Sequence, residues 1–130
     1  MKLLLDTHTL LWWLSNDNRL GSPVRTLIGD PANDVQVSVV SLWEIVVKVR
    51  VGKLRADIED IVIACERNGI VLLDISPRHL RILSGLAKRH GDPFDHLLIA
   101  QAIAEHATFI SDDWNTTKYD VDTMVCSGGH

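Results

Sequence analysis

The chain has 130 residues, of which 46% are hydrophobic and 23% are charged, and its net charge is −4. This length and composition fit one globular domain, residues 1–130, that buries its own core, and they exclude a disordered chain. The acidic balance argues against a protein that grips nucleic acid with its whole surface, because such a surface is basic.

The first third of the chain predicts a strand and two helices. The apolar run from Lys2 to Leu5 is typical of a buried strand. Residues 9–14 fit a short helix that ends in the polar turn at residues 15–18. Ser22 and Pro23 then predict the N-cap and the first residue of a second helix.

The middle third predicts two more strands and two more helices. Residues 35–39 are rich in valine and fit a second strand. Ser41 and Glu44 have the spacing of a capping box, which would open a helix at residue 41. We expect a further helix over residues 57–67 and a third strand over residues 70–73.

The last third continues the alternation of helices and strands. Ser76 begins a helix that we expect to reach about residue 90, and residues 94–106 form a long apolar helix. Strands are predicted over residues 108–110 and 123–125. Strands that alternate with helices predict an α/β fold with a mostly parallel sheet of four or five strands, covered on both faces.

Cysteine content and the start of the chain bear on the compartment. Cys65 and Cys126 are the only two cysteines, too few for a disulfide framework or a zinc motif, and a reducing cytosol fits them best. The opening apolar run meets Asp6 after three leucines, which is too short for a signal peptide or a membrane span. We therefore expect a cytoplasmic protein with no membrane segment.

Acidic residues follow three of the predicted strands. Asp6 comes directly after the first strand, Asp112 and Asp113 after the fourth, and Glu44 a few residues after the second. Because parallel strands end at one edge of a sheet, these acids should share that edge. A helix N-cap remains an alternative role for Asp6, and the capping box remains one for Glu44.

Asp95 lies on a helix that is apolar almost all round. It shares a helical face with Leu98, Ile99 and Ala102. An ionised carboxylate on such a face is costly unless it is paired or bound to a metal. The alternative is a solvated acid in the first turn, favoured by the helix dipole.

The four acidic sites together predict a cluster of hard oxygen ligands. Carboxylates brought this close repel one another, and a bound cation relieves the repulsion. Oxygen ligands favour Mg²⁺ or Mn²⁺ over zinc. Such a site suits phosphodiester hydrolysis, in which the metal polarises the phosphoryl oxygens and activates a water.

Four motifs, in this order and spacing, resemble those of PIN-domain nucleases and, within them, the VapC-type toxins of bacterial toxin–antitoxin pairs. The resemblance covers nearly the whole chain. The motifs are Leu4-Leu5-Asp6-Thr7-His8, Val39-Val40-Ser41-Leu42-Trp43-Glu44-Ile45, Asp92-Pro93-Phe94-Asp95-His96-Leu97-Leu98-Ile99-Ala100-Gln101-Ala102 and Phe109-Ile110-Ser111-Asp112-Asp113.

The resemblance implies a three-layer α/β/α sandwich and an endoribonuclease that depends on Mg²⁺ or Mn²⁺. It also implies an antitoxin partner and a homodimer. Carried over by motif, the catalytic metal-binding acids are Asp6, Glu44, Asp95 and Asp113, while Asp112 falls on a variable position.

Other residues of the motifs have supporting roles by the same resemblance. Thr7 and Ser111 match hydroxyl positions that could orient water or phosphate, and Ser41 is a further supporting candidate. Asp92 is interpreted mainly as a cap before Pro93. His96 stands where related proteins often carry arginine, and we expect a surface histidine there rather than a metal ligand.

Basic and aromatic residues offer weaker indications. Lys48 and Arg50 belong to the densest basic stretch, and they are candidate RNA contacts or simply a solvated helix end. Trp12 and Trp13 point in different directions on a helix, and packing or an interface is favoured for them over base stacking.

Three other functions compete with the ribonuclease hypothesis. An Asp-dependent phosphatase would need a second aspartate two residues after Asp6, where the chain has His8. A non-catalytic PIN-like protein-binding module would be expected to have lost one of the four acids. A nuclease that cuts DNA remains open, because metal chemistry at phosphate does not sense the sugar.

Overall fold

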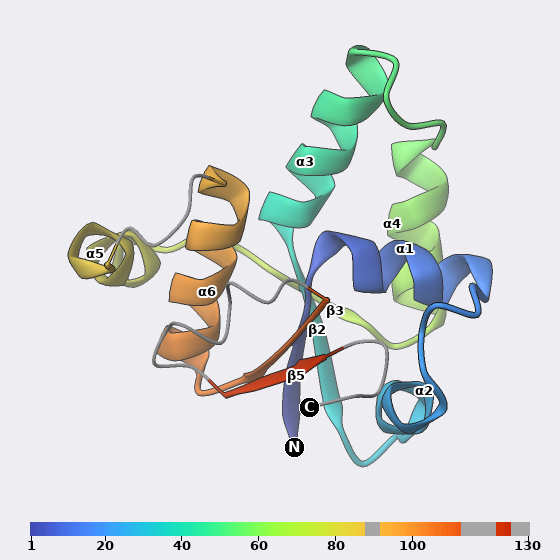
Figure 1. Ribbon diagram of the computed structural model, residues 1–130, viewed down its shortest axis with the longest axis horizontal. Coiled ribbons are helices and arrows are strands. Elements are labelled where there is room, and N and C mark those ends of the chain that lie inside the picture. The colour runs from blue at the N-terminus through green and yellow to red at the C-terminus, as the bar shows by residue number, and fades with distance from the viewer. Residues whose placement is uncertain (88–91, 113–121, 126–130) are drawn as a thin grey trace.

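The computed structural model describes residues 1–87, 92–112 and 122–125. Within these residues one parallel sheet runs in the order β3-β2-β1-β4-β5 (Figure 1). The strands are β1 (Lys2–Leu5), β2 (Asp34–Ser38), β3 (Val71–Leu73), β4 (Thr108–Ser111) and β5 (Thr123–Val125). The helices are α1 (Thr7–Ser15), α2 (Ser22–Gly29), α3 (Val39–Arg50), α4 (Ile58–Arg67), α5 (Pro77–Gly85) and α6 (Pro93–Glu105).

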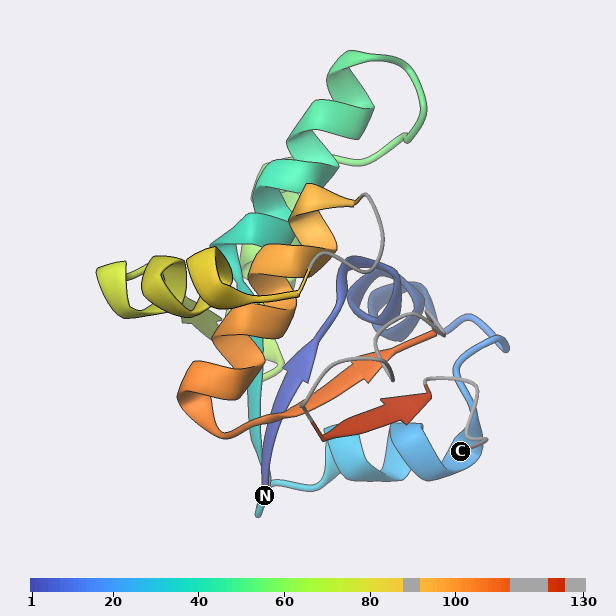
Figure 2. The same ribbon diagram turned by 60° about the vertical axis from the view of Figure 1, so that its left-hand side comes forward.

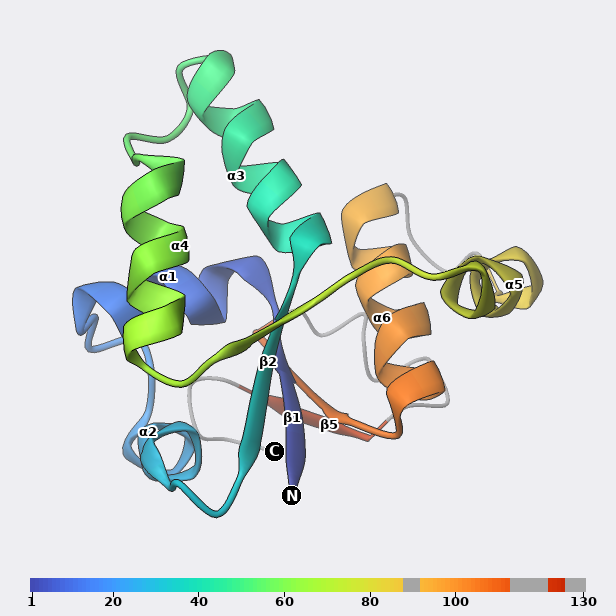
Figure 3. The same cartoon turned by 180° about the vertical axis from the view of Figure 1, so that it is seen from behind.

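The central strand β1 explains why the sheet needs cover on both faces. Leu3, Leu4 and Leu5 are all 0% exposed, although successive side chains of a strand point to opposite faces. Leu3 and Leu5 belong to a core cluster shared with α1, α2 and α4, whereas Leu4 packs in a second cluster with α6. These helices lie on opposite sides of the sheet (Figures 1 and 3). The predicted three-layer α/β/α sandwich is therefore confirmed.

The order of the strands creates a reversal point beside β1. The chain moves from β1 to β2 and β3 on one side, then returns to place β4 and β5 on the other side (Figure 2). In open α/β sheets, ligands bind beyond the carboxyl ends of the strands at such a reversal. The segments that follow β1 and β4 flank this place.

Two predicted N-caps are wrong, that of α3 by three residues and that of α2 by one. Ser38 caps α3, since its hydroxyl accepts a hydrogen bond from the Val40 N–H at 3.0 Å, so the capping box expected at Ser41 does not form. Helix formation begins in a valine pair because Val40 is completely buried there, and tertiary packing outweighs its strand preference. Gly21, not Ser22, is the N-cap of α2.

The helix predicted to run to about residue 90 is also shorter than expected. α5 begins where predicted, with Ser76 as its N-cap, but it ends at Gly85. Leu86 has an extended backbone (φ −76°, ψ 135°), which stops the helix. In the part of the chain that the structure describes, no helix is both long and apolar enough to span a bilayer.

The buried central strand leads to a stability prediction. Leu4→Ala should lower the free energy of unfolding by about 2–5 kcal/mol, because it removes a large side chain from a packed core. The matched control is Ile63→Ala on α4, at a side chain that is 41% exposed, which should change stability by less than about 1 kcal/mol. Urea unfolding monitored by circular dichroism measures both, and equal losses in the two variants would contradict the assigned core.

Candidate active site

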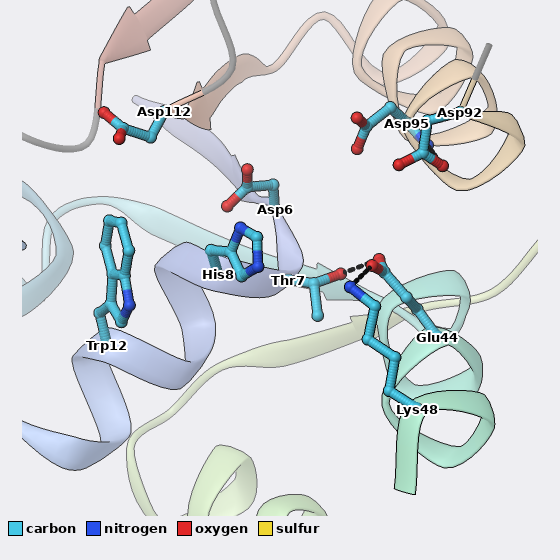
Figure 4. A pocket seen from close by; sticks show the side chains of 9 residues that line it. All are labelled: Asp6, Thr7, His8, Trp12, Glu44, Lys48, Asp92, Asp95 and Asp112. Atoms are coloured by element: carbon cyan, nitrogen blue, oxygen red, sulfur yellow. Dashed lines mark hydrogen bonds and ion pairs between the residues drawn. The ribbon is translucent and has the colours of Figure 1, made fainter. Parts of the chain in front are cut away.

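A cavity of about 400 Å³ opens at the carboxyl ends of the strands. Five carboxylates of the described part of the chain line it, and Figure 4 shows that they come from separate parts of the sequence. The acids are Asp6, Glu44, Asp92, Asp95 and Asp112, and the other lining residues are Thr7, His8, Trp12 and Lys48.

Asp6 lies at the end of β1 and is only 6% exposed. Its carboxylate accepts a hydrogen bond from the Thr9 N–H at 2.8 Å, and its own N–H donates to the Ile110 carbonyl at 3.0 Å. Asp6 is therefore the N-cap of α1 and a lining residue of the cavity at once, so the cap does not exclude a functional role.

Burial raises the pKa of Asp6 above its ordinary value. Hydrogen bonds from Thr9 and Ser111, and the nearby His8, act in the opposite direction without cancelling that effect. A carboxylate kept out of water in this way is less stable when ionised, and a cation beside it would restore the lost solvation.

Glu44 lies in the second turn of α3 and is 6% exposed. The Thr7 hydroxyl donates to its Oε1 at 2.6 Å, and the Lys48 ammonium lies 2.6 Å from its Oε2. Figure 4 shows both contacts at the edge of the cavity. Because the capping box does not form, these two partners account for the buried carboxylate instead.

Asp92 and Asp95 come from the start of α6. Asp92 is the N-cap and accepts from the N–H of Phe94 at 2.9 Å and of Asp95 at 3.4 Å, which confirms the predicted cap. Asp95 is half-buried in the first turn and faces the cavity (Figure 4). Leu98 and Ile99, on the helical face that Asp95 shares, are 0% exposed, as the pattern predicted.

The segment after β4 supplies the remaining acids. Ser111 is buried at the end of the strand and forms a hydrogen bond with Asp6. Asp112 is exposed and lines the cavity. Asp113, which the motif selects as the fourth ligand, lies outside the described residues, so its assignment stays a prediction.

Several predicted residues do not line this cavity. Ser41 is buried inside α3, and its hydroxyl has no hydrogen-bond partner among the residues described. Arg50 is exposed and lies away from the cavity lining. His96 is half-buried rather than on the surface, because it lines a small separate pocket with Leu83 and Leu86 beside α5.

Two lining residues were not assigned to the site from the sequence. His8 and Trp12 lie one turn apart on α1, and their rings stack with centroids 5.9 Å apart. The signal was present as an i, i+4 pair that begins two residues after Asp6. Core packing accounts for only part of the Trp12 side chain, because this residue contacts the core and also lines the cavity.

The donor set of the cavity fits a hard divalent cation. All five acidic side chains offer oxygen, which suits Mg²⁺ or Mn²⁺. Among the described residues, no three His, Cys, Asp or Glu side chains form a ready cage for a metal. The three described candidate ligands, Asp6, Glu44 and Asp95, therefore line the same cavity but do not form such a group.

Similar folds occur in several solved complexes. The VapBC2 crystal structure from Rickettsia felis, bound to a DNA fragment from its promoter, contains a chain with a TM-score of 0.73 and 17% identity, covering 95% of this chain and 98% of that one. A toxin-antitoxin complex from Klebsiella pneumoniae matches with a TM-score of 0.67, 14% identity and coverages of 95% and 96%. FitAcB from Neisseria gonorrhoeae matches with a TM-score of 0.64, 18% identity and coverages of 95% and 96%.

Sequence comparison identifies the family. No curated protein sequence matches the chain closely enough to count as a relative. The family model described as PIN domain matches residues 3–122, which is nearly the whole chain and includes all four motifs. This match gives no support to the Asp-dependent phosphatase. The chain belongs to the PIN domain family.

Proposed function

We propose that this chain is a Mg²⁺- or Mn²⁺-dependent endoribonuclease and the toxin of a type II toxin–antitoxin pair. The observation that carries the proposal is the acidic cavity at the carboxyl ends of the strands. Its carboxylates come from β1, α3, the start of α6 and the end of β4. Among the described residues, five acids and one lysine line this cavity, and this excess of negative charge favours a cation-dependent site over a module that only binds protein.

Asp6, Glu44 and Asp95, together with Asp113, would hold the divalent ion. When bound, the ion supplies Lewis acidity at the phosphoryl oxygens and lowers the pKa of a water. Hydrogen bonds within the chain orient these acidic side chains without any bound ion. The Thr9 N–H and Ser111 orient Asp6, Thr7 orients Glu44, and Asp92 fixes the first turn of α6 from which Asp95 projects.

Of the residues that the structure describes, Lys48 is the one that places an ammonium in the lining of this cavity. It stabilises the buried Glu44 carboxylate by direct contact at 2.6 Å. If a cation were bound beside Glu44, the Lys48 ammonium could contact a phosphate at the same edge of the cavity. Lys48 therefore remains our first candidate for an RNA contact, whereas Arg50 could act only outside the cavity.

Partners follow from the family and from the folds that resemble this one. The Klebsiella pneumoniae structure is a toxin-antitoxin complex, which supports an antitoxin as the protein partner of this chain. We also propose that the chain forms a homodimer and that it is a cytoplasmic protein. RNA is favoured over DNA as the substrate by the resemblance to VapC-type toxins.

The acids lead to a direct test of catalysis. Asp6→Asn and Asp95→Asn should each lower Mn²⁺-dependent cleavage of single-stranded RNA at least about 100-fold, because each removes a charged ligand without changing side-chain size. Asp34→Asn is the matched control, since Asp34 is exposed at the opposite end of β2. Gel assays with labelled RNA and a DNA oligonucleotide of the same sequence, with Mg²⁺, Mn²⁺ or EDTA, measure the loss.

Three outcomes would contradict this proposal. Wild-type cleavage by either variant would remove that residue from the site. Cleavage of DNA alone would replace the RNA assignment with a DNA nuclease. If neither the RNA nor the DNA oligonucleotide were cleaved with either metal, the protein-binding module would be favoured.

The raised pKa of Asp6 gives a prediction about stability. The folded chain holds the Asp6 proton more tightly than the unfolded chain, so the stability that this group contributes is present in acid and is lost as the pH rises through the raised pKa. In EDTA at neutral pH, Asp6→Asn should therefore melt at a higher temperature than wild type. Asparagine keeps an oxygen for the Thr9 N–H but carries no charge.

The size of this difference should depend on pH and on metal. It should shrink below about pH 4, where an ordinary aspartate is protonated in the unfolded chain as well. Added Mn²⁺ should raise the melting temperature of wild type more than that of the variant. Scanning calorimetry measures both trends, and a variant that melts below wild type at every pH would show that ionised Asp6 stabilises the fold.

A further inference from the structure

A second cavity, of about 450 Å³, adjoins the acidic one. His8 and Trp12 line both, so the two cavities share a wall made by the first turns of α1. The far side of the second cavity is formed by the segment between α3 and α4, at Leu54 and Arg55. We call this second space the Trp12 cavity.

The two cavities carry opposite charge. Counting the described residues alone, five carboxylates and one ammonium line the acidic cavity, whereas two guanidinium groups and one carboxylate line the Trp12 cavity. The carboxylates of the acidic cavity would repel the phosphates of an RNA strand, except a phosphate beside Lys48 and a bound cation. The next phosphate along the strand could instead contact the positively charged side chains of the adjoining Trp12 cavity.

Planar side chains form a fixed wall of the Trp12 cavity. The His8 and Trp12 rings are nearly parallel, at 14°, and the Arg19 guanidinium lies 4.7 Å from the centre of the Trp12 ring. Asp17 holds Arg19 in place through contacts of 2.7 and 3.1 Å, and this pairing lowers the pKa of Asp17 to about 2. These contacts restrict the Trp12 and Arg19 side chains before anything binds, and such restriction reduces the entropy cost of binding.

Arg55 differs from Arg19 in its contacts. Within the described residues it forms no ion pair or hydrogen bond, and its side chain is exposed at the rim of the cavity. Arg19 is already neutralised by Asp17, so Arg55 is the guanidinium of this cavity that is free to take a phosphate.

We propose that the Trp12 cavity binds the nucleotide next to the cleaved phosphodiester of single-stranded RNA. The base packs against the His8–Trp12 wall and Leu54, and Arg55 contacts the phosphate. A single strand is required because the base must leave its stack to reach the wall. This inference rests on the proposed function, since the acidic cavity defines which phosphodiester is cut. A helix of a protein partner is the alternative occupant, but an apolar helix would leave Arg55 without an anion.

The test measures binding without cleavage. In EDTA, the affinity for a fluorescein-labelled single-stranded RNA hexamer is measured by anisotropy at several salt concentrations. Arg55→Ala should weaken binding about 5–10-fold and reduce the slope of log K against log salt by about 0.7, the value for one phosphate contact on a single strand. Arg67→Ala, an exposed arginine at the end of α4, makes the same charge change away from both cavities and should weaken binding less than 2-fold.

A second measurement locates the RNA on the protein. The indole N–H signal of Trp12, assigned by its loss in Trp12→Phe, should shift when the hexamer is added. An unmoved signal, or equal losses in the Arg55 and Arg67 variants, would overturn the inference. So would an amphipathic helical peptide that moves the signal when RNA does not, because it would assign the cavity to a protein. Binding at Trp12 without any metal-dependent cleavage would instead overturn the proposed function and support an RNA site here.

Discussion

The fold removes two carboxylates almost completely from water, which costs free energy. Asp6 and Glu44 are each 6% exposed, and burial raises the pKa of Asp6. Such groups destabilise a fold unless hydrogen bonds or positive charges compensate for the lost hydration. The chain supplies partial compensation through Thr7, Thr9 and Lys48. The remaining deficit at Asp6 is what a divalent cation would remove.

The sheet explains why these acids meet although they are far apart in the sequence. β1 lies between β2 and β4, and its three leucines are buried on both faces, so its position is fixed from two sides. The Asp6 N–H extends the pairing of β1 to the Ile110 carbonyl of β4, which ties the acid to the reversal point of the sheet. α6 then brings Asp95 to the same edge, because its apolar face is anchored in the core by Leu98 and Ile99.

Much of this arrangement could be predicted from the sequence, because it depends on periodicity and order along the chain. The apolar run before Asp6 and the apolar helix after Asp95 led to the correct fold and to one shared edge. The partners of Glu44 could not be predicted, because the spacing of Ser41 and Glu44 matches a capping box and so assigned Glu44 a different role. Ser38 is the actual N-cap of the helix. The shared wall of His8 and Trp12 was missed for a similar reason. Local spacing shows which side chains share a helix face, but not which cavity that face lines.

Anomalous diffraction from crystals soaked in Mn²⁺ would show whether Asp6 and Asp95 bind one divalent cation. If they do, we expect a manganese peak in the acidic cavity, about 2.0–2.2 Å from carboxylate oxygens of both residues. The same map would show whether Asp112 or Asp113 completes the coordination. A manganese peak elsewhere on the molecule, with the acidic cavity left without one at saturating Mn²⁺, would show that Asp6 and Asp95 do not form a divalent-cation site.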